Sequence, residues 1–384
     1  MIHSAIGVSD EIDPLTAINQ IITTCQEQLG PVIPQAGLFF SSCMEADFAN
    51  LLQRINQAFP SLELIGCTTD GELSRDSGFI EDAFALLLIA GDGLEFASAV
   101  ARDISRQPGE SFRAAVSDAR GRLHGEPVCA LTFPDGMTTF DFPYDQVFRQ
   151  SFGENFPVFG GTAGDHWLFT GTYQFHRDQV YRDAAPMLLL AGDLQIAHAV
   201  EAGPVPFGPS YPVTRHQNNV LYEIDGKSAI AFHQEHFGTI DDKTIYFPLA
   251  AYQEECDHFL LRDQVGYNHD EGSITCVGNF PERCRVRLTL VSRESVLDAA
   301  GRANQAVLQQ SGFTPELLLL FPCCSLRHVL GSKTSEKFAL LKSGKAPIAF
   351  FGFYCYGELA PPAAGTSVFH SDTYVILALA STQR

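Results

Sequence analysis

The sequence has few of the features that mark membrane, secreted or fibrous proteins. It has only one Trp and four Met among its 384 residues, although it has 30 Phe. It has no long apolar run, because stretches such as Ala83–Ala90 and Pro186–Ala191 are far too short to span a bilayer. The first residues carry neither a basic segment nor a long apolar one, so we expect no signal peptide.

Positive charge is also scarce. The chain has 25 Lys and Arg against 45 Asp and Glu, which gives a formal net charge of −20. Such a chain repels phosphate backbones and anionic lipid surfaces, so we expect neither nucleic acid nor a membrane as a partner. The ten cysteines form no Cys-x-x-Cys pair, and most lie in apolar runs, as Cys67, Cys129 and Cys276 do. This pattern predicts reduced, buried thiols and a cytoplasmic protein.

The most informative feature that is present is an internal repeat. Residues 38–100 contain a short apolar strand, a helical stretch, a glycine-containing corner and a longer apolar strand. The same order returns in residues 131–200 and again in residues 317–379. The three corners are Gly66–Leu73, Phe159–Asp165 and Gly352–Leu359. We therefore predict three duplicated units.

The repeat predicts an α/β fold of internally duplicated strand–helix–strand units, which form sheets covered by helices. Wholly apolar strands indicate sheets with both faces buried. We expect the alternating strands 94–100 and 194–200 to close the first and second units. The Pro/Gly-rich stretch 203–212 is the best boundary between two domains, 1–205 and 206–384.

The segment before the third unit has its own local signals. Asp225-Gly226 predicts a tight turn after a strand. Ser292 and Gly312 are placed to cap and to stop a helix over 296–310.

In these motifs the chain resembles the FIST family, with an N-terminal FIST domain over 1–205 and a C-terminal FIST domain over 206–384. The resemblance rests on the corners Gly66–Leu73 and Phe159–Asp165, on Val213-Thr214 with residues 220–226, and on Tyr356–Pro361 followed by Phe369–Thr373. It covers nearly the whole chain.

The resemblance implies a sensory protein of bacterial signalling, not an enzyme. It implies a small-molecule ligand such as an amino acid, and a separate signalling partner such as a histidine kinase or a cyclic-dinucleotide enzyme. We expect a separate partner because the sequence has no room for an output domain. Some stand-alone members resemble nitric-oxide-sensing haem proteins, so a haem-based sensor is an alternative.

The expected ligand site lies in the third unit, where side chains follow strands at the carboxyl end of a sheet. Arg327 is suited to clamp a carboxylate, Glu358 to anchor an amine, and Tyr356 to stack on a ligand or bond to it. A purely structural pair between Arg327 and Glu358 is the alternative. The candidates in this unit are Cys323, Arg327, Tyr356, Gly357, Glu358 and His370.

Glycine corners offer a second kind of site. The backbone N–H groups around Gly160, Gly161 and Gly164 are suited to hold a carboxylate or a phosphate. No phosphate-loop signature surrounds them, so glycines of a tight turn are the alternative.

Other chemistry is possible at four places. A small-molecule enzyme could use Cys67 or the Tyr356–Glu358 corner. Asp70 and Glu72 could pair as general acid and base, and the alternative is that they are exposed corner carboxylates. Cys323-Cys324 would suit a redox switch if Arg327 lowered a thiol pKa. His233 and His236 lie three apart on one face of a predicted helix, where a metal site is conceivable and surface histidines are the default interpretation. The candidate axial ligands for haem are His233, His236, His269 and His370.

Overall fold

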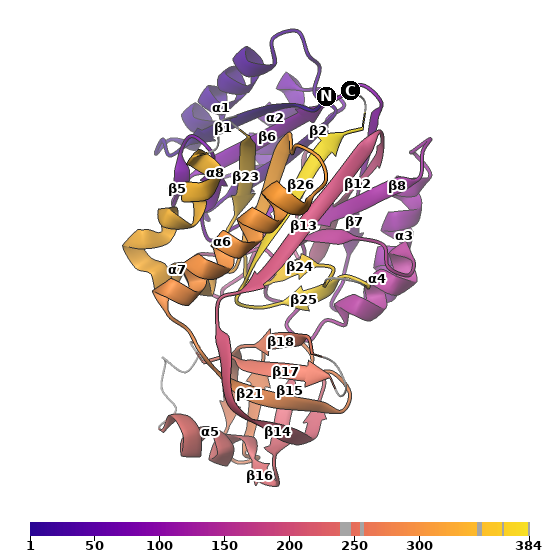
Figure 1. Cartoon of the computed structure of the whole chain (residues 1–384). Helices are drawn as coiled ribbons and strands as arrows, with labels where there is room; N and C mark the ends of the chain where they lie inside the picture. The colour runs from indigo at the N-terminus through magenta and orange to yellow at the C-terminus, as the bar shows by residue number, and fades with distance from the viewer. Residues whose placement is uncertain (239–246, 254–256, 344–347, 363–364, 383–384) are drawn as a thin grey trace.

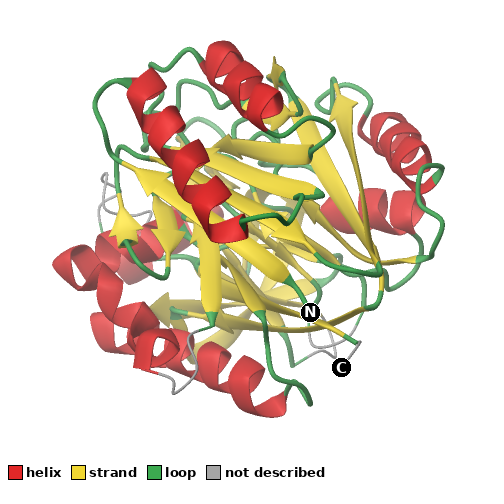
Figure 2. Ribbon diagram, turned by 90° about the horizontal axis from the view of Figure 1, so that it is seen from above, coloured by secondary structure: helices red, strands yellow, loops and turns green. Residues whose placement is uncertain are grey.

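The computed structural model describes residues 1–238, 247–253, 257–343, 348–362 and 365–382. Three six-stranded sheets form the larger part of the molecule, and a fourth sheet lies below them (Figure 1). Seen from above, strands fill the centre and helices lie outside them (Figure 2). The predicted α/β class, with sheets covered by helices, is confirmed.

The first unit contains six strands and two helices, and four of the strands are neighbours in one sheet. Its elements are β1 (His3–Ser9), α1 (Pro14–Leu29), β2 (Ala36–Ser41), α2 (Phe48–Ala58), β3 (Glu63–Thr68), β4 (Glu72–Ser74), β5 (Gly78–Ile80) and β6 (Phe84–Ala90). The order in the sheet is β1-β6-β2-β3, with β2 and β3 parallel and the other pairs antiparallel.

The second unit repeats this order. Its elements are β7 (Leu94–Arg102), α3 (Pro108–Arg120), β8 (Pro127–Thr132), α4 (Tyr144–Phe152), β9 (Val158–Gly161), β10 (Gln174–His176), β11 (Gln179–Tyr181) and β12 (Ala184–Gly192). The sheet order is β7-β12-β8-β9, again with one parallel pair, β8 and β9.

The third unit has the same strand order and more helices. Its elements are β13 (Leu194–Ala202), α6 (Arg293–Gln310), β22 (Leu317–Pro322), α7 (Cys324–Leu330), the 3-10 helix η2 (Gly331–Phe338), α8 (Ala339–Ser343), β23 (Ala349–Phe353), β24 (Glu358–Ala360), β25 (Val368–His370) and β26 (Thr373–Ser381). The sheet order is β13-β26-β22-β23. The predicted triplication is therefore confirmed.

The prediction for the two alternating strands is wrong. β7 pairs with β12 and β13 pairs with β26, so each of these strands opens the following unit instead of closing its own. Strands that are adjacent in sequence usually pair, but here the short turns after β6 and β12 carry the chain into the next sheet. β1, which no sequence signal had indicated, is the equivalent strand of the first unit.

Each unit lends its short hairpin to another unit. The hairpin β10–β11 of the second unit pairs with β3, and β24–β25 of the third unit pairs with β9. The hairpin β4–β5 of the first unit pairs with β23, which closes the cycle. This exchange ties the three sheets together through backbone hydrogen bonds.

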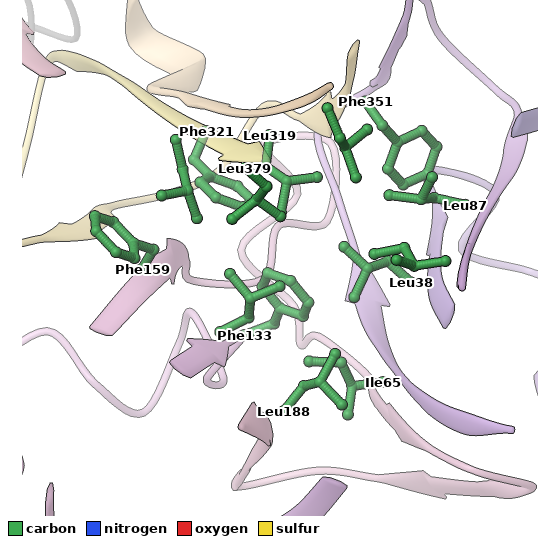
Figure 3. Close-up of a cluster of buried hydrophobic side chains, with 14 of the residues drawn as sticks. Leu38, Ile65, Leu87, Phe133, Phe159, Leu188, Leu319, Phe321, Phe351 and Leu379 are labelled. Carbon is green, nitrogen blue, oxygen red and sulfur yellow. The ribbon is translucent and has the colours of Figure 1, made fainter. Parts of the chain in front are cut away.

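A single apolar core fills the space between the three sheets. Alternate residues of the central strands face it, such as Leu38 of β2, Leu131 of β8 and Leu319 of β22. Figure 3 shows side chains from all three units meeting there. The other faces pack against helices: α1 and α2 on the first sheet, α3 and α4 on the second, α6 and α7 on the third. Both faces of each sheet are therefore buried, as the apolar strands predicted.

One glycine in each parallel pair is required by a close approach. A Cβ at Gly66, Gly160 or Gly352 would overlap the carbonyl oxygen of the neighbouring strand. The three positions are equivalent, because each lies in the second strand of its parallel pair. Positions in the three corners that follow can therefore be compared by counting from this glycine.

The fourth sheet is inserted between β13 and α6. Its elements are β14 (Val205–Gln217), β15 (Val220–Ile224), β16 (Lys227–Ser228), α5 (Ala229–Phe237), β17 (Leu249–Gln253), β18 (Phe259–Arg262), β19 (Gln264–Asn268), β20 (Ser273–Cys276) and β21 (Cys284–Leu290). The turn Asp225-Gly226 is confirmed, with φ of 51° and 76° joining β15 to β16. Ser292 caps α6 through a capping box, as predicted.

The chain leaves the three-sheet body after Ala202 and returns to it at α6. Strands from both sides of residue 205 share hydrogen bonds, as β13 does with β26 and β4 with β23. The boundary 205/206 stays a prediction. Within the described residues, no helix combines the length and the apolar character that a membrane crossing requires.

Candidate functional site

The three corners meet at one point, at the carboxyl ends of the parallel strand pairs. Four residues after the close-approach glycine, the units carry Asp70, Gly164 and Tyr356, respectively. Each of these donates its backbone N–H to the next corner, and the three bonds form a closed ring. They run from Gly164 to Thr68 (2.9 Å), from Asp70 to Tyr354 (3.0 Å) and from Tyr356 to Thr162 (3.2 Å).

The second corner differs from the other two in length. A single glycine, Gly71 or Gly357, joins the ring to the hairpin in the first and third units, whereas residues 165–173 do so in the second. This loop holds three non-glycine residues in the left-handed region: His166 (φ 57°), Trp167 (φ 59°) and Phe169 (φ 51°). Such backbone conformations are costly for bulky residues and gather at functional sites.

Asp165 holds the loop in place. Its carboxylate accepts the N–H groups of Phe169 (3.0 Å), Thr170 (2.7 Å) and Gly171 (3.0 Å). The Tyr356 hydroxyl donates to the same carboxylate and accepts the N–H of Trp167 at 2.8 Å. Tyr356 therefore fixes the loop, and its ring stacks on that of Phe169 with centroids 5.1 Å apart.

Arg327 of α7 faces the ring of corners. Its guanidinium pairs with Asp70 at 2.9 Å and also with Glu81, and it lies 5.4 Å from the ring centroid of Phe79. Arg327 is 12% exposed, Asp70 is fully buried and Glu81 is 48% exposed. Burial raises the pKa of Asp70 to about 6, because the loss of hydration outweighs the attraction of Arg327.

Glu358 has other partners than Arg327. Its carboxylate accepts the N–H of Thr373 at 2.9 Å and the hydroxyl of Thr373 at 2.6 Å. It is fully buried, and burial raises its pKa to about 8. Arg327 and Tyr356 therefore lie at the meeting point of the corners. Glu358 is the first residue of β24, in the hairpin that follows the corner.

Glu72 is the equivalent of Glu358 in the first unit. It accepts hydrogen bonds from Thr69 (2.5 Å) and Ser42 (2.8 Å), and burial raises its pKa to about 8. Reading Asp70 and Glu72 as exposed carboxylates is wrong, since both are buried. Polarity in the sequence suggested exposure, but Glu72 begins the hairpin β4–β5, which joins the sheet of the third unit.

The glycine candidates have packing roles in the structure. The N–H groups of Thr162, Ala163 and Gly164, which follow Gly160 and Gly161, already donate to backbone carbonyls. A Cβ at Gly161 would collide with Cys355, and one at Gly357 would overlap the ring of Phe369. A ligand role for these glycines stays a prediction.

The thiol chemistry expected near Arg327 is not favoured. The predicted lowering of a thiol pKa at Cys323-Cys324 is wrong, because burial raises the pKa of both thiols, that of Cys324 to about 12. Burial likewise raises the pKa of Cys67, the opposite of what a thiolate nucleophile needs. The nine described cysteines are all free thiols.

Three of the four candidate haem ligands contact other groups of the protein. His370 is buried, bonds through Nε2 to the carbonyl of Ala360 at 3.2 Å, and has its pKa lowered by burial to about 4. His233 is buried rather than exposed and contacts Gln264 at 2.8 Å. His236 contacts Tyr211 at 3.2 Å, and His269 is exposed. Haem binding stays a prediction.

Across the described ranges, no group of three or more His, Cys, Asp or Glu side chains is arranged to hold a metal ion. Neither the ion pair of Arg327 with Asp70 and Glu81 nor the role of Asp165 was predicted from the sequence. The unequal lengths of the corners did signal the importance of the segment that Asp165 begins. Residues 165–173 are an insertion in one of three otherwise equivalent turns.

Comparisons with known proteins agree with this reading of the chain. The FIST N domain pattern matches residues 35–227, and the FIST C domain pattern matches residues 229–361. A protein of Methanocaldococcus jannaschii described as uncharacterised is 25% identical over 274 residues, which are 68% of this chain and 52% of that protein. This chain therefore spans about half the length of that relative.

Two solved structures of cyanuric acid hydrolases are also similar. One, from A. caulinodans, has a TM-score of 0.39 and 9% identity, and the alignment covers 99% of each chain. The second has a TM-score of 0.36 and 10% identity, over 99% of this chain and 100% of the other. These likenesses are too weak to support a conclusion about activity.

Proposed function

The chain belongs to the FIST family, and from this membership and the site geometry we propose that it is a non-enzymatic sensor of a small zwitterionic ligand such as an amino acid. FIST domains are associated with sensory signal transduction. The observation that carries the proposal is the ion-pair group at the meeting point of the corners, in which Arg327 is shared by buried Asp70 and half-exposed Glu81.

An amino acid carries the same pair of charges as this group. Its carboxylate would replace that of Glu81 on the planar guanidinium of Arg327. Glu81 is the carboxylate that is easier to displace, because it is 48% exposed and regains water on release, whereas Asp70 is fully buried. The ligand's ammonium would lie beside Asp70, whose Oδ1 has no hydrogen-bond partner in the described structure.

Ligand binding at this place would change contacts between units. Arg327 belongs to the third unit, Asp70 and Glu81 to the first, and the loop 165–173 to the second. A ligand shifts an equilibrium only through different affinities for its two states, and contacts between units are where such states can differ. We propose that the change is read by a separate partner, such as a histidine kinase or a cyclic-dinucleotide enzyme.

Thermal unfolding with single amino acids tests the proposal. A ligand at a hundred times its Kd should stabilise the protein by about 2.7 kcal/mol. Arg327→Ala and Asp70→Asn should abolish this shift. Arg302→Ala is the matched control, because Arg302 forms an exposed ion pair with Glu201 at 2.9 Å, and it should keep the shift. The absence of a shift with any amino acid, or its retention in both site variants, would refute the proposal.

A further inference from the structure

Beside the ion-pair group lies a second set of polar atoms without partners. Lys337 of η2 is 3% exposed, and Tyr354 of the third corner is fully buried. In the described structure neither Lys337 Nζ nor the Tyr354 hydroxyl has a hydrogen-bond partner, and Nζ lies 4.8 Å from the Tyr354 ring centroid. Native proteins seldom leave such groups unsatisfied, since each costs about 1–3 kcal/mol.

This pair is continuous with the ion-pair group. The carbonyl of Tyr354 accepts the N–H of Asp70 at 3.0 Å. The ring of Tyr354 meets that of Phe79 edge-on, with centroids 5.3 Å apart, and Phe79 also lies under Arg327. Arg327 Nε has no hydrogen-bond partner either, within the same described region. Arg327 and Lys337 therefore lie at the two ends of one pair of contacting rings.

Arg327 and Lys337 differ in the number of carboxylates that neutralise them. Arg327 has two carboxylates, whereas no carboxylate among the described residues lies within ion-pair distance of Lys337. Burial lowers the pKa of Lys337 to about 7, and Glu358 with the nearby thiols of Cys323 and Cys324 opposes that shift only in part. An anion placed against Lys337 and Tyr354 would supply the missing partner of both groups.

We propose that the ligand is an acidic amino acid, whose second carboxylate is bound by Lys337 and Tyr354. This inference rests on the proposed function: Arg327 binds the α-carboxylate and Asp70 the ammonium. Lys337 and Tyr354 then determine specificity, since the site rejects a ligand that leaves the buried ammonium and hydroxyl unpaired.

Calorimetric titration with L-glutamate, L-aspartate and their amides tests this specificity. At least one acidic ligand should bind at least tenfold tighter than its amide. Lys337→Met should reduce this preference to less than twofold, mainly by weakening the binding of the acidic ligand. The same variant should melt at a higher temperature than the wild type when no ligand is present, because it removes a buried amine that has neither a counterion nor a hydrogen-bond partner in the described structure.

Tyr354→Phe removes only a hydroxyl, so it keeps the test valid if Lys337→Met does not fold. It should weaken binding of the acidic ligand severalfold and that of the amide less, because a hydrogen bond to a charged acceptor is stronger than one to a neutral carbonyl. Equal affinities of the wild type for acid and amide would overturn the inference alone, as would a preference that survives both variants. Binding of none of the amino acids would instead overturn the proposed function.

Discussion

The second corner and its two counterparts share a backbone frame and differ in what is added to it. All three contribute one hydrogen bond to the closed ring, and all three follow a glycine packed against a neighbouring carbonyl. Only the second carries the loop 165–173, and only the third unit faces it with α7 and Arg327. Repetition therefore explains the frame, and departures from repetition mark the site.

The polar positions of the corners diverge in the same way. The hairpin begins with Glu72 in the first unit, Gln174 in the second and Glu358 in the third. Two units therefore carry a buried carboxyl where the second carries a buried amide. The position on the ring is an acid, a glycine or a tyrosine. Such divergence teaches that backbone contacts maintain the threefold arrangement while side chains are free to specialise.

The largest expected effect comes from breaking the shared frame. Gly66→Val places a side chain into the carbonyl oxygen of Phe39, and backbone cannot move aside as a flexible side chain can. We expect a loss of at least about 3 kcal/mol of unfolding free energy, which chemical denaturation measures. Gly301→Ala is the control, because a Cβ there meets nothing within 4 Å, and it should be neutral or stabilising by about 0.5–1 kcal/mol. Equal losses in both variants would contradict the account.

Replacing the loop sharpens the comparison. A variant in which one glycine stands for residues 165–173 gives the second unit the corner of the other two. It should fold, since the ring and the sheets are unchanged, and it should bind the ligand more weakly, because the loop contacts Tyr356 of the ring and His328 of α7. Circular dichroism and calorimetric titration measure the two properties. Wild-type affinity in this variant would show that the loop has no part in the site.

A smaller effect is expected from the hydroxyl that joins the third corner to the loop. Tyr356→Phe removes the donor to Asp165 and the acceptor for the N–H of Trp167, and should cost about 1–3 kcal/mol. Tyr181→Phe removes a single exposed hydrogen bond to Arg102 and should change stability by less than about 0.5 kcal/mol. Denaturant unfolding compares the two. A larger loss in Tyr181→Phe would be inconsistent with the structure.

A further expected effect is a dependence of the unfolding free energy on pH. Because the pKa of Glu72 is raised to about 8 in the folded state, the folded protein holds its proton more tightly than the unfolded chain does. The stability that Glu72 contributes is therefore complete below its unfolded pKa of about 4.5 and is lost as pH rises to about 8.

Glu72→Gln should flatten the fall in stability between pH 5 and pH 8 by at most about 1.4 kcal/mol per pH unit. Gln174→Glu, at the equivalent buried position, should steepen it. Melting temperatures of the three proteins across this range provide the measurement. Parallel curves for all three would mean that these positions do not titrate.

The sequence predicted the triplicated frame because apolar strands and glycine spacings recur at three places. It did not predict the exchange of hairpins, since β4, β10 and β24 are too short to show which sheet they join. It identified Arg327 and Tyr356 from their positions after strands. It did not pair Arg327 with Asp70 and Glu81, because contacts between units distant in sequence leave no local pattern.

The role of Asp165 was also not predictable from the sequence. Its place in the motif Phe159–Asp165 was evident, but its role depends on the loop that follows and on Tyr356. Lys337 and Tyr354 carried no signal at all: a lysine in a short polar helix predicts exposure, and only the packing of η2 on the third sheet buries it.

A crystal structure of the protein soaked with saturating L-glutamate tests the central claim most directly. The account predicts a ligand carboxylate on Arg327 in the place of Glu81, with the ligand's ammonium beside Asp70. An unchanged group of Arg327, Asp70 and Glu81, with glutamate elsewhere or absent, would contradict it.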